Sequence, residues 1–252
     1  MQSPRILRLE HRRDSLRARL AVVGGPGLSP DHVVTGAGGT DVLALIAAGF
    51  LELGDEAIIC PPTFPLYEIQ IRRRGARAVP CALRTPGFAY DPDAILRAIT
   101  PATRLVYLCS PVNPTGTLLM ADQADRLMSG LPDRVIAVFD ESYRDFVNDP
   151  VAADVCTFLR AGRFVIGVRS FSKSHGLAGL RVGYAVAHPD IARYLRKMRS
   201  PFALGSLQIA GALAALDDPA HLQRTCRTVQ RERVWLYREL DRRGLSPTPS
   251  QA

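Results

Sequence analysis

Lysine is almost absent from this chain of 252 residues, since only Lys173 and Lys197 are lysines among its 32 basic residues. No apolar h-region follows the Arg-rich N-terminus, so no secretory signal is expected. No apolar run is long enough to cross a bilayer, and no membrane partner is expected. The five cysteines include no CxxC pair, which argues against both a disulfide framework and a zinc or other metal site. A reducing cytoplasm is the expected compartment.

The excess of positive charge does not by itself indicate a nucleic-acid partner. The formal net charge is +8 and the pI is about 9.7, but the arginines are spread along the whole chain. The one tight run, residues 72–74, falls in an expected helix, where a solvated face explains it. Binding of phosphate-bearing small molecules would explain the positive net charge equally well. We therefore expect small-molecule partners and no nucleic acid.

The two lysines stand in different surroundings. Lys197 lies in a basic helical stretch, whereas Lys173 lies in the Ser-rich turn Ser170-Phe-Ser-Lys-Ser174. Only a primary amine can condense with an aldehyde, and arginine cannot replace lysine in that chemistry. A lysine kept in such a turn, against a strong bias toward arginine, is a candidate for catalysis.

Short apolar runs alternate with helical patterns along the chain. The runs are continuous and rich in Val and Ile, as expected of strands buried on both faces; they cover residues 57–60, 105–109, 135–139, 164–168 and 182–187. Helices are expected at residues 8–20, 41–52, 67–74, 121–130, 191–198, 203–216 and 219–243, the one at 203–216 being rich in small residues and buried. This alternation predicts an α/β domain whose sheet is mostly parallel.

Polar residues gather directly after three of the expected strands. The segments are Ser110-Pro-Val-Asn-Pro-Thr-Gly116, Asp140-Glu-Ser-Tyr143 and Arg169-Ser-Phe-Ser-Lys-Ser-His-Gly176. Taken singly, each has a plain structural explanation, because Asp140 could cap a helix and the Asn-Pro-Thr-Gly segment could be a turn. The carboxyl ends of parallel strands lie at one edge of a sheet, so their joint placement predicts a ligand crevice there.

A fourth segment, Gly36-Ala-Gly-Gly-Thr-Asp41, precedes an expected helix. Glycines at a helix start leave backbone N–H groups free for an anion. The segment is neither a dinucleotide fingerprint nor a P-loop, because the final Gly of GxGxxG and the GK[ST] sequence are both absent. Alone it is a weak signal.

Together these segments resemble fold-type I pyridoxal-phosphate (PLP) enzymes, in particular the histidinol-phosphate aminotransferase branch of the class I/II aminotransferases. The resembling segments are Gly38-Gly-Thr-Asp41, Pro61-Pro-Thr-Phe64, Asn113-Pro-Thr-Gly116, Asp140-Glu-Ser-Tyr143 and Ser170-Phe-Ser-Lys-Ser-His-Gly-Leu-Ala-Gly-Leu-Arg-Val-Gly-Tyr184. The resemblance implies the three-layer large domain of that family, with a mostly parallel sheet between helices, and a PLP cofactor.

The resemblance also implies catalytic roles. Lys173 is expected to form a Schiff base with PLP and to move the substrate's α-proton. Asp140 is expected to pair with the pyridine nitrogen, which keeps the ring protonated and able to accept electrons. Asn113 and Tyr143 would hydrogen-bond the ring's phenolic oxygen, and Phe64 would stack on the ring. The cofactor phosphate would be held by Gly39, Thr40, Ser170, Ser172 and Arg181.

The chain departs from the family pattern in its sequence and at its ends. Val112 replaces the usual Asn, and Ser142 the usual Ala. The family's N-terminal arm and its C-terminal small domain, which holds the arginine for the substrate carboxylate, are expected to be missing. We expect an N-terminal helix and lead-in at residues 1–28, a PLP-binding large domain at 29–216, and a long helix at 217–252 that leads to the missing small domain. The family completes its site across a dimer interface, so a homodimer is expected.

The resemblance implies an aminotransferase. It would transfer an amino group from histidinol phosphate or an aromatic amino acid to a 2-oxo acid. A decarboxylase of the threonine-phosphate type is an alternative, because which substrate bond breaks depends largely on the missing carboxylate clamp. A PLP-binding sensor or dimerisation module without catalysis is a third hypothesis, and an inert remnant is a fourth.

Overall fold

The computed structural model describes residues 4–149 and 151–252, and side chains of the first helix from residue 12 onward. The first three residues of the expected N-terminal segment thus lie outside the described part. None of the described helices is both long and apolar enough to span a membrane.

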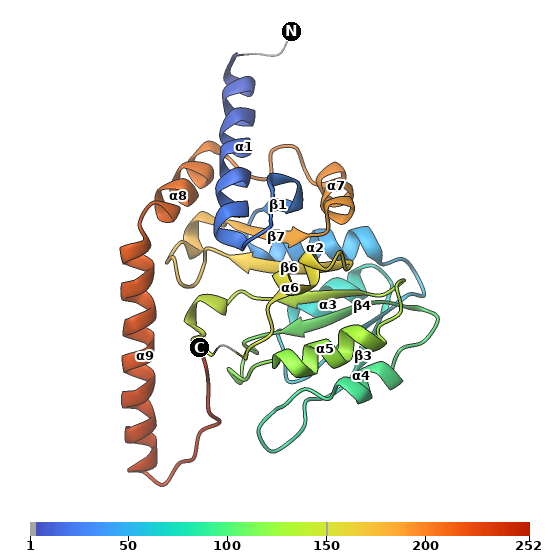
Figure 1. Ribbon diagram of the computed structural model, residues 1–252, viewed down its shortest axis with the longest axis vertical. Helices are drawn as coiled ribbons and strands as arrows, with labels where there is room; N and C mark the ends of the chain where they lie inside the picture. Colours follow the sequence, from blue (N-terminus) through green and yellow to red (C-terminus); the bar gives the residue numbers. More distant parts are fainter. Residues whose placement is uncertain (1–3, 150) are drawn as a thin grey trace.

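A seven-stranded sheet organises the described residues (Figure 1). Its strands are β1 (Val33–Gly36), β2 (Glu56–Ile59), β3 (Arg77–Pro80), β4 (Thr103–Cys109), β5 (Ile136–Asp140), β6 (Val165–Ser170) and β7 (Gly183–Ala187). Their order across the sheet is β1-β7-β6-β5-β4-β2-β3. Only β7 runs antiparallel to its neighbours, which are β1 and β6. The prediction of a mostly parallel sheet is confirmed.

Helices cover both faces of the sheet, which gives three layers. One face carries α2 (Gly39–Phe50), α3 (Leu66–Arg73) and α7 (Pro189–Met198). The other carries α1 (Pro4–Gly24), α4 (Pro92–Arg97), α5 (Ala121–Gly130), α6 (Val155–Arg160) and α8 (Ser206–Leu216). Three short 3-10 turns, η1 (Pro30–His32), η2 (Arg144–Phe146) and η3 (Ala178–Leu180), lie in the connections.

The central strands are apolar throughout because they have two buried faces. Along β4, Leu105 and Tyr107 belong to the apolar core under α2, α3 and α7, while Val106 and Leu108 belong to the core on the opposite face. Successive side chains of a strand point to opposite faces, so a strand between two helical layers needs an apolar residue at every position. The continuous apolar runs of the sequence reflect this arrangement.

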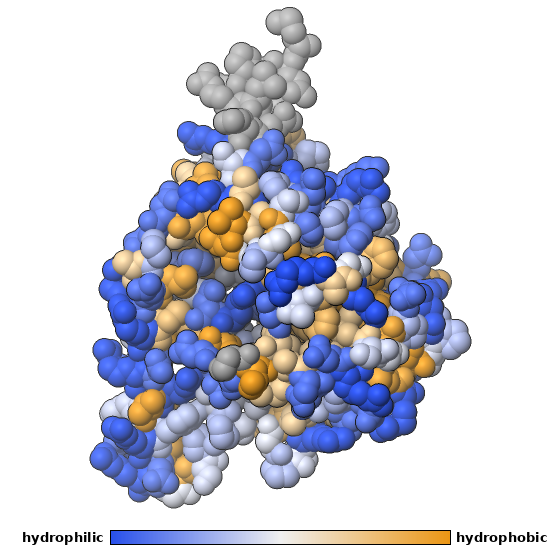
Figure 2. Space-filling model, viewed as in Figure 1, coloured by the Kyte–Doolittle hydropathy of each residue, from blue (hydrophilic) through white to orange (hydrophobic). Residues whose placement is uncertain are grey.

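The last helix, α9 (Pro219–Asp241), runs along one side of the molecule (Figure 1). None of its residues is fully buried, and Val234, Trp235 and Leu236 are exposed. Figure 2 shows mainly hydrophilic residues along this helix, with single hydrophobic ones between them. After it the chain turns back toward the body, where Gln251 N–H donates to Gly116 O at 2.8 Å.

Two short strands and two short helices were not expected from the sequence. β1 and β3 have four residues each, and β3 lies partly exposed at the edge of the sheet with Arg77 at its start. Neither strand presents a long apolar run. Helix α8 begins at Ser206 rather than at residue 203, and only Ile209 and Ala212 are buried in it. The expectation of a buried helix there is therefore wrong for most of its length. The two short unexpected helices, α4 and α6, have six residues each.

Candidate active site

The three polar segments predicted to meet do lie at one edge of the sheet, because β4, β5 and β6 are parallel neighbours. Cys109 at the end of β4 is in register with Asp140 at the end of β5. Asp140 is in turn in register with Val168 of β6. Asp140 thus occupies the middle of this edge, between the Asn113 loop and the Lys173 turn.

A small cavity opens at this edge. It is lined by Phe64, Cys109, Asn113, Asp140, Ser142, Tyr143 and Lys173. The lining includes five residues predicted to surround the cofactor ring, drawn from the segment before α3 and from the loops after the three strands. The Nζ atom of Lys173 lies 5.0 Å from the centre of the Tyr143 ring. A primary amine, a phenol and a buried carboxylate therefore face one small space.

Asp140 is a buried carboxylate that has hydrogen bonds but no cationic partner. Its side chain is 5% exposed. Tyr67 Oη donates to Oδ2 at 2.7 Å, and Ser142 donates to Oδ1 through Oγ at 2.6 Å and through its backbone N–H at 3.1 Å. Among the described residues no Arg, Lys or His forms an ion pair with it. Burial raises the pKa of Asp140, and the hydrogen bonds from Ser142 and Tyr67 act in the opposite direction.

The N-terminus of α2 lies beside this cavity. Its N-cap residue is Gly38, with φ 88° and no side-chain hydrogen bond, so the first N–H groups of the helix have no side-chain acceptor from the cap. A Cβ on Gly38 would overlap the guanidinium of Arg181, and one on Gly183 would overlap the backbone of Gly38 and Gly39. Glycine is therefore required at position 183, where two backbones approach each other, and is favoured at position 38 by its positive φ.

Ser170, Ser172 and Arg181 lie beside the N-terminus of α2 and form one corner of the site with it. Arg181 Nη1 donates to Ser172 Oγ at 3.3 Å and to Ala178 O at 2.9 Å. Ser170 Oγ accepts the backbone N–H of Ser172 at 3.1 Å. Arg181 itself adopts a left-handed backbone with φ 54°, which is uncommon and strained for a residue with a side chain. Uncapped N–H groups, hydroxyls and a guanidinium together form a donor set suited to a phosphate.

The predicted residues fall into two neighbouring groups. Phe64, Asn113, Asp140, Tyr143 and Lys173 line the cavity. Gly39 and Thr40, the first two residues of α2, lie in the corner with Arg181 and the two serines. An ideal Cβ on Gly39 would lie 3.7 Å from Ser142 Oγ and 3.9 Å from Ser170 Cβ, so Ser142 borders both groups.

Sequence reasoning misses Tyr67 and the contacts of Ser142 and Cys109. The sequence puts Tyr67 in a helix and assigns it no role. Cys109 is expected to be a small core residue; it is buried, and it also lines the cavity. Ser142 stands out in the sequence only as a departure from the usual alanine.

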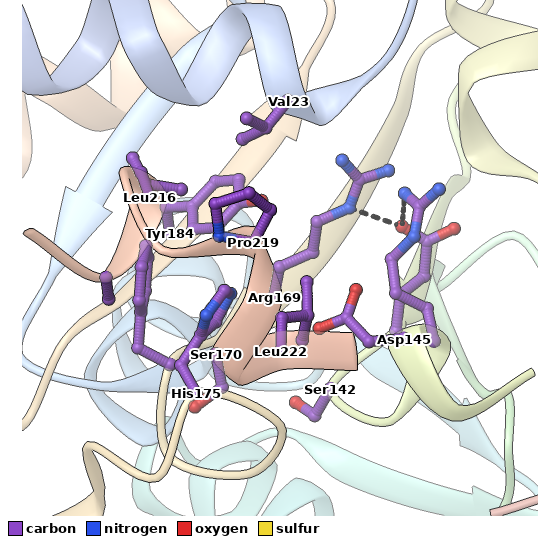
Figure 3. A pocket seen from close by; sticks show the side chains of 14 residues that line it. Val23, Ser142, Asp145, Arg169, Ser170, His175, Tyr184, Leu216, Pro219 and Leu222 are labelled. Carbon is purple, nitrogen blue, oxygen red and sulfur yellow. Dashed lines mark hydrogen bonds and ion pairs between the residues drawn. The ribbon is translucent and has the colours of Figure 1, made fainter. Parts of the chain in front are cut away.

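A second cavity lies on the α1 side of the β5 and β6 ends (Figure 3). Arg169, His175 and Tyr184 line it, and α9 closes it with Pro219 and Leu222. Its most deeply buried charged pair is Arg169 and Glu141. These two charges are paired with each other, whereas Asp140 has no cationic partner among the described residues.

Comparison with known proteins identifies the family. The model of the class I and II aminotransferases matches residues 8–252. The chain belongs to this family. The chain is 38% identical over 227 residues to the histidinol-phosphate aminotransferase of Moorella thermoacetica. The match covers 90% of the chain and 58% of that relative. It is 36% identical to the aromatic amino acid aminotransferase of Mycobacterium bovis over 94% of the chain and 67% of the relative.

The fold comparison agrees. The histidinol-phosphate aminotransferase of Sinorhizobium meliloti, solved in complex with pyridoxal-5'-phosphate, superposes with a TM-score of 0.88 at 27% identity. The match covers 96% of the present chain and 65% of the solved one. The chain therefore has the large-domain fold of the fold-type I aminotransferases and spans about three fifths to two thirds of the length of these relatives.

Proposed function

We propose that the chain acts as a PLP-dependent aminotransferase that moves an amino group from an amino donor to a 2-oxo acid. The observation that carries this proposal is the buried carboxylate of Asp140, which has no cationic side-chain partner among the described residues and faces the same cavity as Lys173. A buried charge without a partner is costly, and a protonated pyridine ring is a cation that would match it.

The residues present fit the cofactor. Asp140 would hold the ring nitrogen, Asn113 and Tyr143 the phenolic oxygen, and Phe64 the face of the ring. The corner formed by the α2 N-terminus, Ser170, Ser172 and Arg181 would hold the phosphate. Gly38 supports this assignment, because any side chain there would displace the Arg181 guanidinium from the helix start.

Bound PLP supplies an electron sink for the α-carbon of an amino acid. Lys173 would hold the cofactor aldehyde through its amine, and once the donor's amine has taken that place, the freed Lys173 amine would accept the substrate's α-proton and return it one step later. Asp140 would hold the ring nitrogen and balance its positive charge. The ring of Tyr143 lies 5.0 Å from the Lys173 amine, so both groups would lie beside the bound cofactor.

The donor is proposed to be histidinol phosphate or an aromatic amino acid, because the two sequence relatives carry those names. This likeness also favours transamination over the decarboxylation that the sequence leaves open. We further propose a homodimer and a cytoplasmic location, which fits the five free cysteines. The proposed division of the chain is into residues 1–28, 29–216 and 217–252. All the candidate cofactor residues lie in the middle part.

The test is covalent attachment of PLP to the purified chain. After incubation with PLP and removal of the excess, we expect visible absorption by the bound cofactor. Borohydride reduction should then leave its mass on the peptide that contains Lys173. Lys197→Ala is the matched control, because it removes the other lysine, from an exposed position in a helix.

Lys173→Ala should lose both the absorption and the mass, while Lys197→Ala should retain them. Equal loss in the two variants would refute the assignment of Lys173. A well-folded chain that never takes up PLP would refute the proposed function itself.

A further inference from the structure

The carboxylate of Asp140 is held between two hydroxyl groups that come from different elements. Tyr67, from α3, donates to Oδ2, and Ser142, from the loop after β5, donates to Oδ1. We propose that Tyr67 and Ser142 are positioning residues that keep Asp140 ionised and fix the direction in which it faces the cavity. This assignment rests on the proposed function, in which Asp140 meets a cationic ring nitrogen.

The position of the Tyr67 hydroxyl is fixed by packing. The side chain is fully buried, and its ring stacks on Tyr107 with centroids 5.0 Å apart and an interplanar angle of 13°. Phe64 meets it edge-on at 5.6 Å. The ring cannot turn without displacing either neighbour, so its hydroxyl stays within hydrogen-bonding distance of Asp140, at 2.7 Å. One stretch at the start of α3 thus brings both a cavity-lining aromatic ring and a hydrogen-bond donor to the site.

Ser142 holds the other oxygen in a complementary way. Its Oγ and its backbone N–H both donate to Oδ1, at 2.6 and 3.1 Å. Because each carboxylate oxygen accepts a hydrogen bond from a hydroxyl, two contacts rather than one fix the plane of the carboxylate. These donors favour the charged form of a group whose burial favours the neutral one. Both donors therefore oppose the effect of burial on Asp140 before any cation is bound.

The chain offers two controls of the same chemical change. Tyr90 is fully buried and donates to Cys109 O at 2.7 Å, so Tyr90→Phe removes a buried hydrogen bond that does not involve Asp140. Tyr107 is also buried, and its hydroxyl has no partner among the described residues. Tyr107→Phe therefore removes a hydroxyl from the ring stacked on Tyr67 without removing a hydrogen bond.

The experiment follows the carboxyl carbon of Asp140 by NMR in the full chain labelled at the aspartate carboxyl, without PLP. Asp140→Asn identifies the signal. We expect Tyr67→Phe and Ser142→Ala each to move the titration of Asp140 to higher pH, by about a tenfold change in proton affinity. Tyr90→Phe and Tyr107→Phe should leave it in place, and Ser142→Thr should restore it.

A titration that is unchanged in both Tyr67→Phe and Ser142→Ala, or that moves equally in all the tyrosine variants, would overturn the proposal. If Tyr67→Phe does not fold, Ser142→Ala decides alone. Because this measurement contains no PLP, its result stands apart from the success or failure of the proposed function. In a second measurement, equilibrium dialysis should show about tenfold weaker binding of PLP by Tyr67→Phe than by Tyr107→Phe, and equal binding would again count against the proposal.

Discussion

Replacement of Arg169 by methionine tests whether the polar interior beside the candidate site contributes to stability. Arg169 Nε lies 2.7 Å from Glu141 Oε2, and the two side chains are only 4% and 6% exposed (Figure 3). Arg169 Nη1 also donates to Gly24 O at the end of α1, at 2.5 Å. Arg169→Met removes the cation and leaves Glu141 with Arg144, 3.3 Å away and partly exposed, and the backbone N–H of Val155.

The expected loss is about 3–5 kcal/mol of unfolding free energy, which is typical when one partner of a buried ion pair is removed and the other remains charged. Methionine fills much of the space of the arginine stem, so most of the loss would be electrostatic. The loss of the contact with Gly24 adds to it by weakening the attachment of α1 to the sheet.

The loss should depend on pH. Burial raises the pKa of Glu141, and Arg169 is the main group acting in the opposite direction. A carboxyl with a raised pKa binds more protons in the folded chain than in the unfolded one, so stability falls as pH rises from about 4.5 through the folded pKa. Without Arg169 the pKa of Glu141 is higher still, so the pH range over which stability falls extends to higher pH. The deficit of the variant should therefore be small in acid and largest near neutral pH.

Urea unfolding at a series of pH values measures this directly. The control is Arg126→Met, which breaks an ion pair with Asp93 at 2.9 Å in which both side chains are more than half exposed. That change should cost at most about 1 kcal/mol at every pH. If Arg169→Met costs no more than Arg126→Met, or if its cost does not vary with pH, the reasoning about Glu141 is wrong.

Two further predictions concern the candidate site. Gly38→Ala should weaken PLP binding measurably in equilibrium dialysis, because its Cβ would displace Arg181 and its φ of 88° is strained for alanine; undiminished affinity would remove this corner from the phosphate site. Asp140→Ala should still allow PLP to attach to Lys173, as judged by borohydride reduction, but amino-group transfer in a single-turnover assay should collapse. Normal transfer rates would exclude Asp140 from the mechanism.

The sequence predicts the centre of the sheet better than its edges, for a physical reason. Strands β4, β5 and β6 are buried on both faces and therefore have long apolar runs. Strands β1 and β3 lie at the edges with four residues each, and β3 is partly exposed, so neither has such a run. The direction of β7 could not be predicted either, because an apolar run looks the same in both directions; its pairing with β6 is antiparallel.

The site divides in a similar way. The polar residues that directly follow a strand could be predicted, because strand ends are recognisable and parallel strands end at one edge. Contacts between side chains of distant elements could not. The bond of Tyr67 to Asp140 spans 73 residues, and that of Arg169 to Glu141 spans 28. In the sequence Tyr67 resembles any aromatic residue on the buried face of a helix, and only packing shows where its hydroxyl points.

The hydrogen bonds of Asp140 show what the structure adds to the sequence motif Asp140-Glu-Ser-Tyr143. An aspartate after a strand could be a cap, and its bond from the Ser142 N–H alone would fit that explanation. A cap does not need two buried hydroxyls from separate elements. These donors are arranged around a carboxylate that no described cation neutralises, at a cavity that also contains Lys173. These donors favour the charged form of Asp140 although burial raises its pKa, and the proposed pairing with a cationic ring nitrogen requires that form.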